Sequence, residues 1–399
     1  MKSFYINKNK LILIVNCFWA IPLVFLFRFI NQFNKINIIK IRSDRFGHFA
    51  PDGAEQVAKF QIKTKKIIFY VFDWYICNHQ WAKMLSKKLP VYNILRPVYF
   101  WNEYIPGGKE ISKPAADKVS RDINLLFTRY NVRLPFEQKD QNKAINWLKD
   151  KGWTEGEPFY CVLIRDNAYL NTSLNFKNID WEYHNYRNSN IESFYQAINW
   201  LTEQGVWIVR MGKVMKSPLT IKNNKVIDFP FEKNTSDLLD VWLFANCNGC
   251  ISTGTGPDLL TGIYGNSILF LNYLPLFQIR SDLSSITYPK KLIWEKYDKP
   301  FTIDEYIFDR RLHTNSYKSD EIKIIDMTEY EILNATKEFY YFNLQKKSNK
   351  IIRTHEQKLF WNKILLANKK FNSSSHNKIH QESNISKTFL NNLKTNDQN

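Results

Sequence analysis

The sequence is poor in cysteine and lacks the common motifs of metal and disulfide chemistry. Its 399 residues include five cysteines, at positions 17, 77, 161, 247 and 250. An odd, sparse set argues against a disulfide framework and suits a reducing compartment. Cys247 and Cys250 have the spacing of a metal or redox pair, but no second pair accompanies them. We interpret them as buried structural residues and expect no metal site.

Nucleic-acid motifs are also missing, although the chain is strongly basic. Lysine and arginine number 56 against 38 acidic residues, which gives a net charge of +18. Such a charge can attract nucleic acid, anionic lipid or sugar nucleotides. We find no zinc-finger spacing, RNP-type aromatic motif or basic-region heptad, so nucleic acid is the weakest of these partners and we expect none.

One long apolar run, residues 11–27, lies near the N-terminus. It is at the short edge of what crosses a bilayer, and Asn16 and Pro22 interrupt it. Basic residues flank both ends, and no small-residue cleavage site follows, which argues against a removed signal peptide. We predict that residues 1–30 form a membrane-associated segment that lies at the interface or re-enters the bilayer; a buried core helix is the alternative.

The rest of the chain alternates short β-rich apolar runs with helical stretches. We expect strands at 36–41, 66–72, 91–95, 159–164, 206–209, 226–229 and 268–271, and helices at 80–85, 191–204 and 237–245. This alternation predicts an α/β fold of two Rossmann-like, doubly wound parallel-sheet domains. We place them at residues 31–155 and 156–345, and predict that 346–399 is a polar, partly disordered tail.

The most informative motif is the run Ser252, Thr253, Gly254, Thr255 and Gly256, between an apolar strand and a predicted helix. It is neither a P-loop nor a G-x-G-x-x-G fingerprint. Hydroxyls and glycine amides beside the start of a helix can cradle an anion, usually a phosphate. A tight strand–helix turn with a capping hydroxyl is the alternative.

Cationic residues follow neighbouring strands of the second domain. Arg165 ends one strand, and Arg210 with Gly212 ends the next. Ligands of open α/β sheets bind beyond the carboxyl ends of the strands, and the planar guanidinium suits phosphate. We therefore predict a phosphate site from these residues and the glycine motif, with Lys290 as a further contact. The alternative is that each arginine pairs with a nearby aspartate, and that Lys290 is a solvated surface lysine.

A histidine ends the first strand of the first domain, in the loop Arg45-Phe46-Gly47-His48. A glycine turn there could hold His48 towards a cleft between the two domains. Histidine is well suited to accept a proton near neutral pH. The alternative is a histidine hydrogen-bonded within its own loop.

Several of these stretches together resemble a family of bacterial glycosyltransferases of surface-polysaccharide (O-antigen or capsule) gene clusters. The stretches are 164–170, 186–198, 205–213, the glycine motif with Pro257, and 289–292. The resemblance covers residues 37–345, and Thr255 stands where the family usually has serine. It implies a GT-B-like fold whose two domains face a cleft, a nucleotide-sugar donor, and a saccharide or lipid-linked acceptor.

Glycosyl transfer fits these residues. Arg165, Arg210 and the glycine motif would stabilise the departing nucleoside diphosphate without a metal or other cofactor, while His48 deprotonates the acceptor. The expected location is the cytoplasmic face of the bacterial inner membrane, where sugar nucleotides and lipid-linked acceptors meet. Alternatives are a pyruvyl transferase or sugar-nucleotide epimerase on the same fold, a non-enzymatic membrane scaffold for polysaccharide assembly, and nucleic-acid binding through the basic tail.

Overall fold

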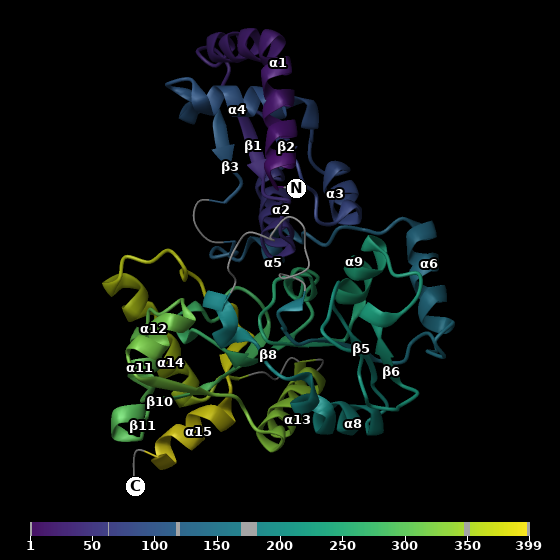
Figure 1. Cartoon of the computed structure of the whole chain (residues 1–399), viewed down its shortest axis with the longest axis vertical. Coiled ribbons are helices and arrows are strands. Elements are labelled where there is room, and N and C mark those ends of the chain that lie inside the picture. The colour runs from purple at the N-terminus through teal and green to yellow at the C-terminus, as the bar shows by residue number, and fades with distance from the viewer. Residues whose placement is uncertain (1, 63, 117–119, 169–181, 347–351, 397–399) are drawn as a thin grey trace. The chain divides into compact units, whose positions relative to one another are not determined.

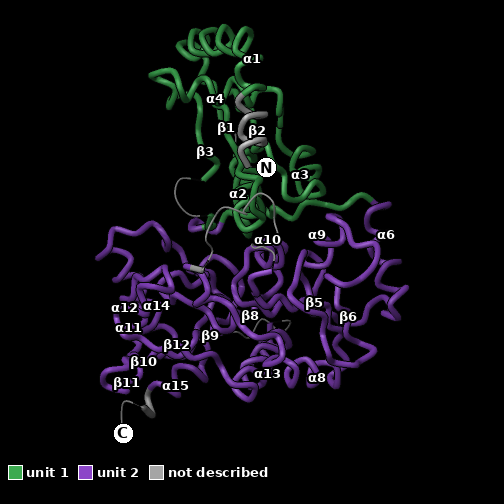
Figure 2. Tube along the Cα trace, in the orientation of Figure 1, with its two compact units in different colours: residues 1–122, 126–137 green, residues 123–125, 138–399 purple. Residues whose placement is uncertain are grey.

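The computed structural model describes residues 2–62, 64–116, 120–168, 182–346 and 352–396 (Figure 1). The chain divides into two compact units (Figure 2). Unit 1 comprises residues 1–122 and 126–137, and unit 2 comprises residues 123–125 and 138–399. The boundary lies earlier than the predicted 155, because helix α6 (Gln138–Lys149) packs on α9 (Asp237–Asn246) of unit 2. Trp242 Nε1 also donates to Gln141 Oε1 at 2.8 Å.

Unit 1 is built on a three-stranded parallel sheet in the order β2-β1-β3. Its elements are α1 (Lys2–Ile30), β1 (Ile36–Ile41), α2 (Phe46–Phe60), β2 (Ile67–Phe72), α3 (His79–Ser86), α4 (Arg96–Tyr104), β3 (Ser112–Pro114) and α5 (Leu126–Tyr130). The strand predicted at 91–95 is wrong. Only Val91 bridges to Tyr70, and Asn93–Leu95 forms a short 3₁₀ turn because the Asn93 side chain accepts from Phe72 N at 2.9 Å.

Unit 2 is built on a seven-stranded sheet in the order β13-β9-β8-β7-β4-β5-β6, and every pairing is parallel. Its strands are β4 (Phe159–Leu163), β5 (Trp207–Arg210), β6 (Val226–Asp228), β7 (Gly249–Ser252), β8 (Ile268–Tyr273), β9 (Ser285–Pro289) and β13 (Ser383–Ile385). A small antiparallel sheet contains β10 (Lys291–Trp294), β11 (Lys299–Pro300) and β12 (Ile322–Ile325). Its helices, besides α6 and α9, are α8 (Tyr195–Glu203), α10 (Leu259–Ile263), α11 (Ile303–Phe308), α12 (Thr314–Ser319), α13 (Glu329–Lys346), α14 (His355–Lys370) and α15 (Lys387–Asn396).

The core of unit 2 surrounds its central strands. All residues of β4, β7 and β8 are buried, as expected of a parallel sheet with both faces covered. The Cys161 and Cys250 positions are register partners on β4 and β7, and Cys247 is buried beside them. All five cysteines are free, and these three are buried, as the sequence predicts for Cys247 and Cys250.

The segment predicted to be a disordered tail belongs to the fold of unit 2. Strand β13 pairs in parallel with residues 285–287 of β9, and α14 and α15 flank it. The prediction is wrong because the averaged composition is polar, whereas a few spaced apolar residues do the packing. Phe360, Trp361, Ile364, Ile385 and Phe389 are each at most 3% exposed.

Both units are therefore α/β structures with parallel sheets, and the predicted class of two Rossmann-like domains is confirmed. The facing of the two domains across a cleft remains a prediction.

Candidate functional site

The predicted site residues of unit 2 come from adjacent strand ends. Leu163 at the end of β4 is the register partner of Ser252 at the end of β7, and Val162 is the partner of Arg210. The loops that leave these strands therefore start at one edge of the sheet. Thr253 and Arg165 are joined directly, because the Arg165 backbone N–H donates to Thr253 Oγ1 at 2.9 Å.

Two arginines lie together beside this edge. Arg165 donates from Nε to Asn188 Oδ1 at 3.2 Å, and Arg187 donates from Nη2 to the carbonyl oxygen of Gly254. Among the described residues, neither guanidinium forms an ion pair with a carboxylate. Burial, with the neighbouring positive charge of Arg187, lowers the pKa of Arg165 to about 10. Two adjacent cations without a counter-ion favour an anionic ligand.

An amide cluster orients Arg165. Asn188 accepts from Arg165 and donates through Nδ2 to Asn167 Oδ1 at 2.6 Å and Asn185 Oδ1 at 3.1 Å. Asn167 Nδ2 donates to Asn185 Oδ1 at 3.1 Å as well. The side chain of Arg165 is thus fixed by neutral groups that leave its charge uncompensated.

Lys290 supports the same loop from below the surface. It is 2% exposed, and its Nζ donates to the carbonyl oxygen of Asn188 at 2.6 Å and lies 2.7 Å from Asp326 Oδ1. Burial lowers its pKa, and Asp326 partly offsets that effect. The structure therefore makes Lys290 a buried positioning residue, not the solvated lysine of the alternative. It acts on Arg165 through Asn188.

The glycine turn, residues 252–256, is capped by the chain itself. Gly254 N–H donates to Ser252 Oγ at 3.0 Å, and Thr255 N–H donates to Asp258 Oδ2 at 2.9 Å. Ser252 Oγ also donates to Asp258 Oδ2 at 2.5 Å. Asp258 is fully buried, and this burial raises its pKa. Two amides that the sequence analysis assigned to an anion are therefore occupied, and the helix that follows, α10, is only five residues long.

Part of the turn still lacks protein partners. Thr255 Oγ1 is buried and has no hydrogen-bond partner among the described residues. Gly254 and Gly256 have φ of +77° and +84°, which favours glycine, and a Cβ on Gly254 would come within 2.9 Å of Tyr273 Cε2. The main chain at Gly254 therefore lies close against the ring of Tyr273. Arg187 is hydrogen-bonded to the carbonyl oxygen of this same Gly254.

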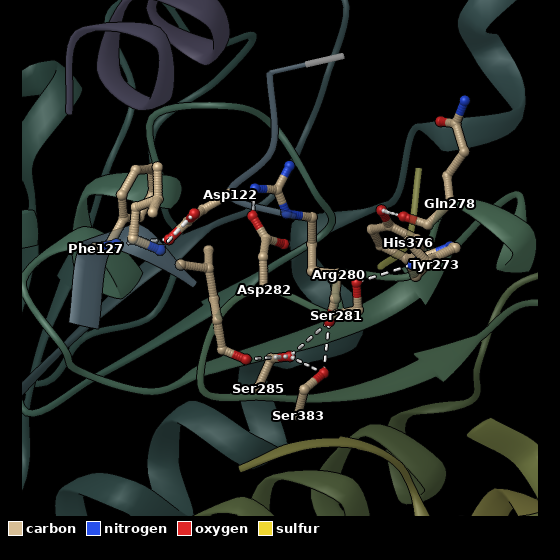
Figure 3. A network of polar contacts seen from close by, with 12 residues as sticks. Asp122, Phe127, Tyr273, Gln278, Arg280, Ser281, Asp282, Ser285, His376 and Ser383 are labelled. Carbon is tan, nitrogen blue, oxygen red and sulfur yellow. Dashed lines mark hydrogen bonds and ion pairs between the residues drawn. The ribbon is translucent and has the colours of Figure 1, made fainter. Parts of the chain in front are cut away.

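A polar network fixes the segment that carries Tyr273 (Figure 3). Tyr273 donates to the carbonyl oxygen of Gln278 at 2.6 Å, and Ser281 Oγ lies 2.9 Å from His376 Nδ1. Ser383 Oγ donates to the carbonyl oxygen of Arg280 at 2.6 Å. The segment 273–281, which packs against the glycine turn through Tyr273, is thus held by residues from the late segment 376–383.

The structure does not place Arg210 with Arg165 and Arg187, which have no carboxylate partner among the described residues. Its side chain is 1% exposed and forms an ion pair with Asp228 at 3.2 Å, and Nη1 donates to the carbonyl oxygen of Ser217 at 2.8 Å. Asp228 is its register partner on β6. Gly212, with φ +151°, packs against Met215, whose Sδ would lie 2.5 Å from an added Cβ. These two residues have structural roles here, which matches the aspartate-pairing alternative for Arg210.

His48 lies in the first turn of α2 in unit 1, not in a loop. Its Nδ1 is 2.7 Å from Ser120 Oγ, which also accepts from Arg42 Nη2 at 2.7 Å. Burial, with the charges of Arg42 and Arg45, lowers the pKa of His48 to about 4. The imidazole is therefore neutral at pH 7, and no described residue is hydrogen-bonded to its Nε2.

Sequence reasoning missed Arg187, Asn188 and Asp258. Arg187 lies outside the strand ends, in the 3₁₀ segment Glu182–Arg187, so the strand-end rule could not find it. Asp258 carries a readable signal, since an aspartate shortly after a Ser/Thr/Gly turn commonly caps it. Within the part of the chain that the structure describes, no group of three or more His, Cys, Asp or Glu side chains could hold a metal ion.

Comparison with known proteins finds similarity only at the level of structure. No protein family model matches the sequence, and no curated protein matches it. A glycosyl transferase family 9 structure from Veillonella parvula DSM 2008 has a TM-score of 0.44 and 11% identity, covering 77% of this chain and 98% of that chain. The ADP-heptose LPS heptosyltransferase II of E. coli has a TM-score of 0.41 and 11% identity, covering 78% of this chain and 100% of that chain. Similarities this weak define no activity for this chain.

Proposed function

We propose that the chain is a glycosyltransferase that binds the diphosphate of a nucleotide sugar at Arg165, Arg187 and the glycine turn. One observation carries the proposal: two guanidinium groups without a carboxylate partner are held side by side at the carboxyl edge of a parallel sheet. Ligands of such sheets bind at this edge. A structural arginine is normally paired, as Arg210 is with Asp228.

The chemistry follows from charge. As the glycosidic bond to the donor breaks, negative charge grows on the departing diphosphate. Arg165 and Arg187 would stabilise that charge with hydrogen bonds fixed in advance, so little reorganisation is needed during the reaction. Thr255 Oγ1, which has no partner among the described residues, and the Gly256 N–H would be further donors in the turn. We propose that no metal takes part.

His48 is the proposed base for the acceptor hydroxyl. Its lowered pKa keeps the imidazole neutral near neutral pH, although it also weakens the base. Nε2 is the free base in the tautomer whose Nδ1–H donates to Ser120 Oγ. The proposal requires an acceptor oxygen within hydrogen-bond reach of Nε2 when both substrates are bound. The acceptor class, a saccharide or lipid-linked saccharide of a bacterial surface polysaccharide, is proposed from the sequence resemblance alone.

The test is a titration of the purified full chain with UDP, GDP, ADP and CMP by calorimetry, followed by donor turnover. Selective binding of one nucleoside diphosphate, and release of that diphosphate from its sugar conjugate when acceptor saccharides are added, would support the proposal. Release of phosphate from phosphoenolpyruvate would indicate pyruvyl transfer, and interconversion of the sugar without release would indicate an epimerase. Binding of no nucleotide would exclude both the glycosyltransferase and the sugar-nucleotide epimerase.

A further inference from the structure

Helix α1 is apolar on two sides. One side packs into unit 1: Leu13, Ala20 and Val24 are at most 7% exposed, and Ala20 and Val24 join a core that includes Val98 and Tyr99 of α4. The other side is open, and its exposed side chains include Leu11 (61%), Ile14 (60%), Val15 (62%), Phe18 (85%), Phe25 (56%) and Phe29 (60%). Residues 11–30 have a mean hydropathy of 2.2, yet only 17% of the apolar window is buried.

Helix α4, which packs against α1, also exposes aromatic side chains. Phe100 and Tyr104 are 39% and 75% exposed and stack on each other, and Phe33 beyond the end of α1 is 73% exposed. Helices α1 and α4 contact each other, and Figure 2 draws both in unit 1. We call the exposed side chains of these two helices, with Phe33, the α1–α4 face.

We propose that the α1–α4 face docks unit 1 on a lipid bilayer, with α1 seated in one leaflet instead of crossing it. This inference does not depend on the proposed function. A contiguous exposed patch of large apolar side chains on a folded unit marks an interaction surface.

Two polar side chains in the apolar part of α1, Asn16 and Trp19, form hydrogen bonds within the helix. Asn16 Nδ2 donates to the carbonyl oxygen of Ile12 at 2.6 Å, and Asn16 Oδ1 accepts from Trp19 Nε1 at 2.6 Å. Trp101 Nε1 of α4 donates to the carbonyl oxygen of Leu13 at 3.2 Å. A segment that enters hydrocarbon must satisfy its donors internally, whereas a water-facing segment has no such need.

Arg28 fixes α1 to unit 1 and opposes a crossing orientation. Its guanidinium makes four hydrogen bonds to the segment 102–106: to Asn102 Oδ1 at 3.0 Å, and to the carbonyl oxygens of Asn102 at 3.2 Å, Ile105 at 2.9 Å and Pro106 at 2.7 Å. Together with the buried side of α1, these bonds attach the helix lengthwise to a polar folded unit. A spanning orientation would have to break this attachment and expose the core residues beneath it.

Charges at the border favour lipid over a second copy of the chain. Lys35, Lys65 and Lys66 are exposed where α1 leads into the sheet, and the Lys35 carbonyl accepts from Ile67 N at 2.9 Å. Lys109 is exposed just after α4, next to the segment that holds Arg28. Glu103 and Glu110 are exposed here as well, but the four lysines outnumber them. This excess of positive charge would oppose a symmetric dimer and attract anionic headgroups. Trp19, Trp101 and Tyr104 supply the amphipathic rings that prefer the interface.

Vesicle flotation of the full chain tests the surface. We expect binding to phosphatidylcholine vesicles that strengthens when phosphatidylglycerol is included. The double variant Phe18→Glu/Phe29→Glu should lower binding at least tenfold. The control is Leu366→Glu on α14, which has a similar exposure of 63% and should leave binding unchanged. The proposal would be overturned if the wild type bound neither vesicle, or if the double variant bound as well as the wild type. It would also be overturned if the wild type formed a dimer that the double substitution dissociates, without binding vesicles.

Cys17 reports the depth. It is partly exposed, while the other four cysteines are buried, so a thiol-reactive fluorophore should label this position, with Cys17→Ser as the labelling control. Nitroxide lipids quench a fluorophore at their own depth. A helix seated in one leaflet predicts stronger quenching by a label near the headgroup than by one near the end of the acyl chain. The reverse order would place Cys17 at the midplane and show a crossing helix.

Discussion

Arg187 donates from its guanidinium to the carbonyl oxygen of Gly254. This bond connects a cation from the segment before residue 190 to the glycine turn after β7, 67 residues later in the chain. It positions a positive charge against a backbone conformation that favours glycine, since Gly254 has φ +77°. The position of the Arg187 charge and the shape of the glycine turn therefore depend on each other.

The first prediction concerns Arg187 and its neighbour Arg165. Arg187→Ala and Arg165→Ala should each weaken binding of the preferred nucleoside diphosphate about tenfold or more, since hydrogen bonds to charged groups contribute about 1.5–3 kcal/mol. Isothermal calorimetry measures the change. Lys363→Ala, which removes an exposed cation of α14, is the control and should bind normally. If both arginine variants retain full affinity, the diphosphate binds elsewhere.

Arg210 should behave differently. Arg210→Ala leaves Asp228 partly buried and uncompensated, so we expect a loss of about 3–5 kcal/mol in the free energy of unfolding. Denaturant titration at pH 7 measures this. Removing both partners, as in Arg210→Met/Asp228→Leu, should restore part of the lost stability. A variant with normal stability but tenfold weaker nucleotide binding would return Arg210 to the ligand role that the sequence first indicated.

Gly254 offers a matched pair of substitutions with Gly205. Both have a positive φ, +77° and +82°, but a Cβ on Gly254 meets Tyr273 at 2.9 Å while one on Gly205 meets nothing within 4 Å. Gly205→Ala should therefore cost about 1–2 kcal/mol of backbone strain alone. Gly254→Ala should cost more and should also weaken nucleotide binding. Equal losses of stability in the two variants, with normal binding, would show that Tyr273 moves aside freely.

His48→Ala should lower turnover about a hundredfold while nucleotide affinity stays near wild type, if His48 accepts the acceptor proton. The acid limb of kcat/KM should lie near pH 4, well below the ordinary pKa of 6.5, because that limb reports the free enzyme. Steady-state rates between pH 3.5 and 8 measure both. A hundredfold loss of nucleotide affinity with normal turnover would mean that His48 shapes the binding site instead.

The same shift affects stability. A histidine whose folded pKa is lowered binds fewer protons than the unfolded chain between pH 6.5 and about 4, so stability rises with pH across that window. This contribution of His48 to the free energy of unfolding is present in full above pH 6.5 and is lost as the pH falls towards 4. Its upper bound is about 3 kcal/mol. His48→Gln should thus lose less stability than wild type between pH 7 and pH 4.5. Parallel loss in both proteins would mean that His48 keeps its ordinary pKa in solution.

Much of this fold is legible in the sequence because the strands are short apolar runs. Strands β1 and β2 lie where the apolar runs predict them, and so does helix α9, for which Ser236 accepts from Leu239 N. The partners of charged groups are not legible in this way. Arg210 and Asp228 are 18 residues apart, and they pair because β5 and β6 are neighbours in register, which no local pattern reveals. For the same reason the strand-end rule selected Arg210 and overlooked Arg187.

Strand β13 also bears on how the protein is made. The sheet of unit 2 ends at β9 until residues 383–385 are available to pair with it. During translation one edge of β9 therefore stays unpaired until almost one hundred further residues have been synthesised. Unpaired strand edges promote association between chains. A ribosome that stops before residue 383 would release a unit whose sheet edge is open and whose segment around Arg280 has lost the Ser383 contact. Premature termination late in the message should therefore yield aggregated protein rather than a shortened, functional one.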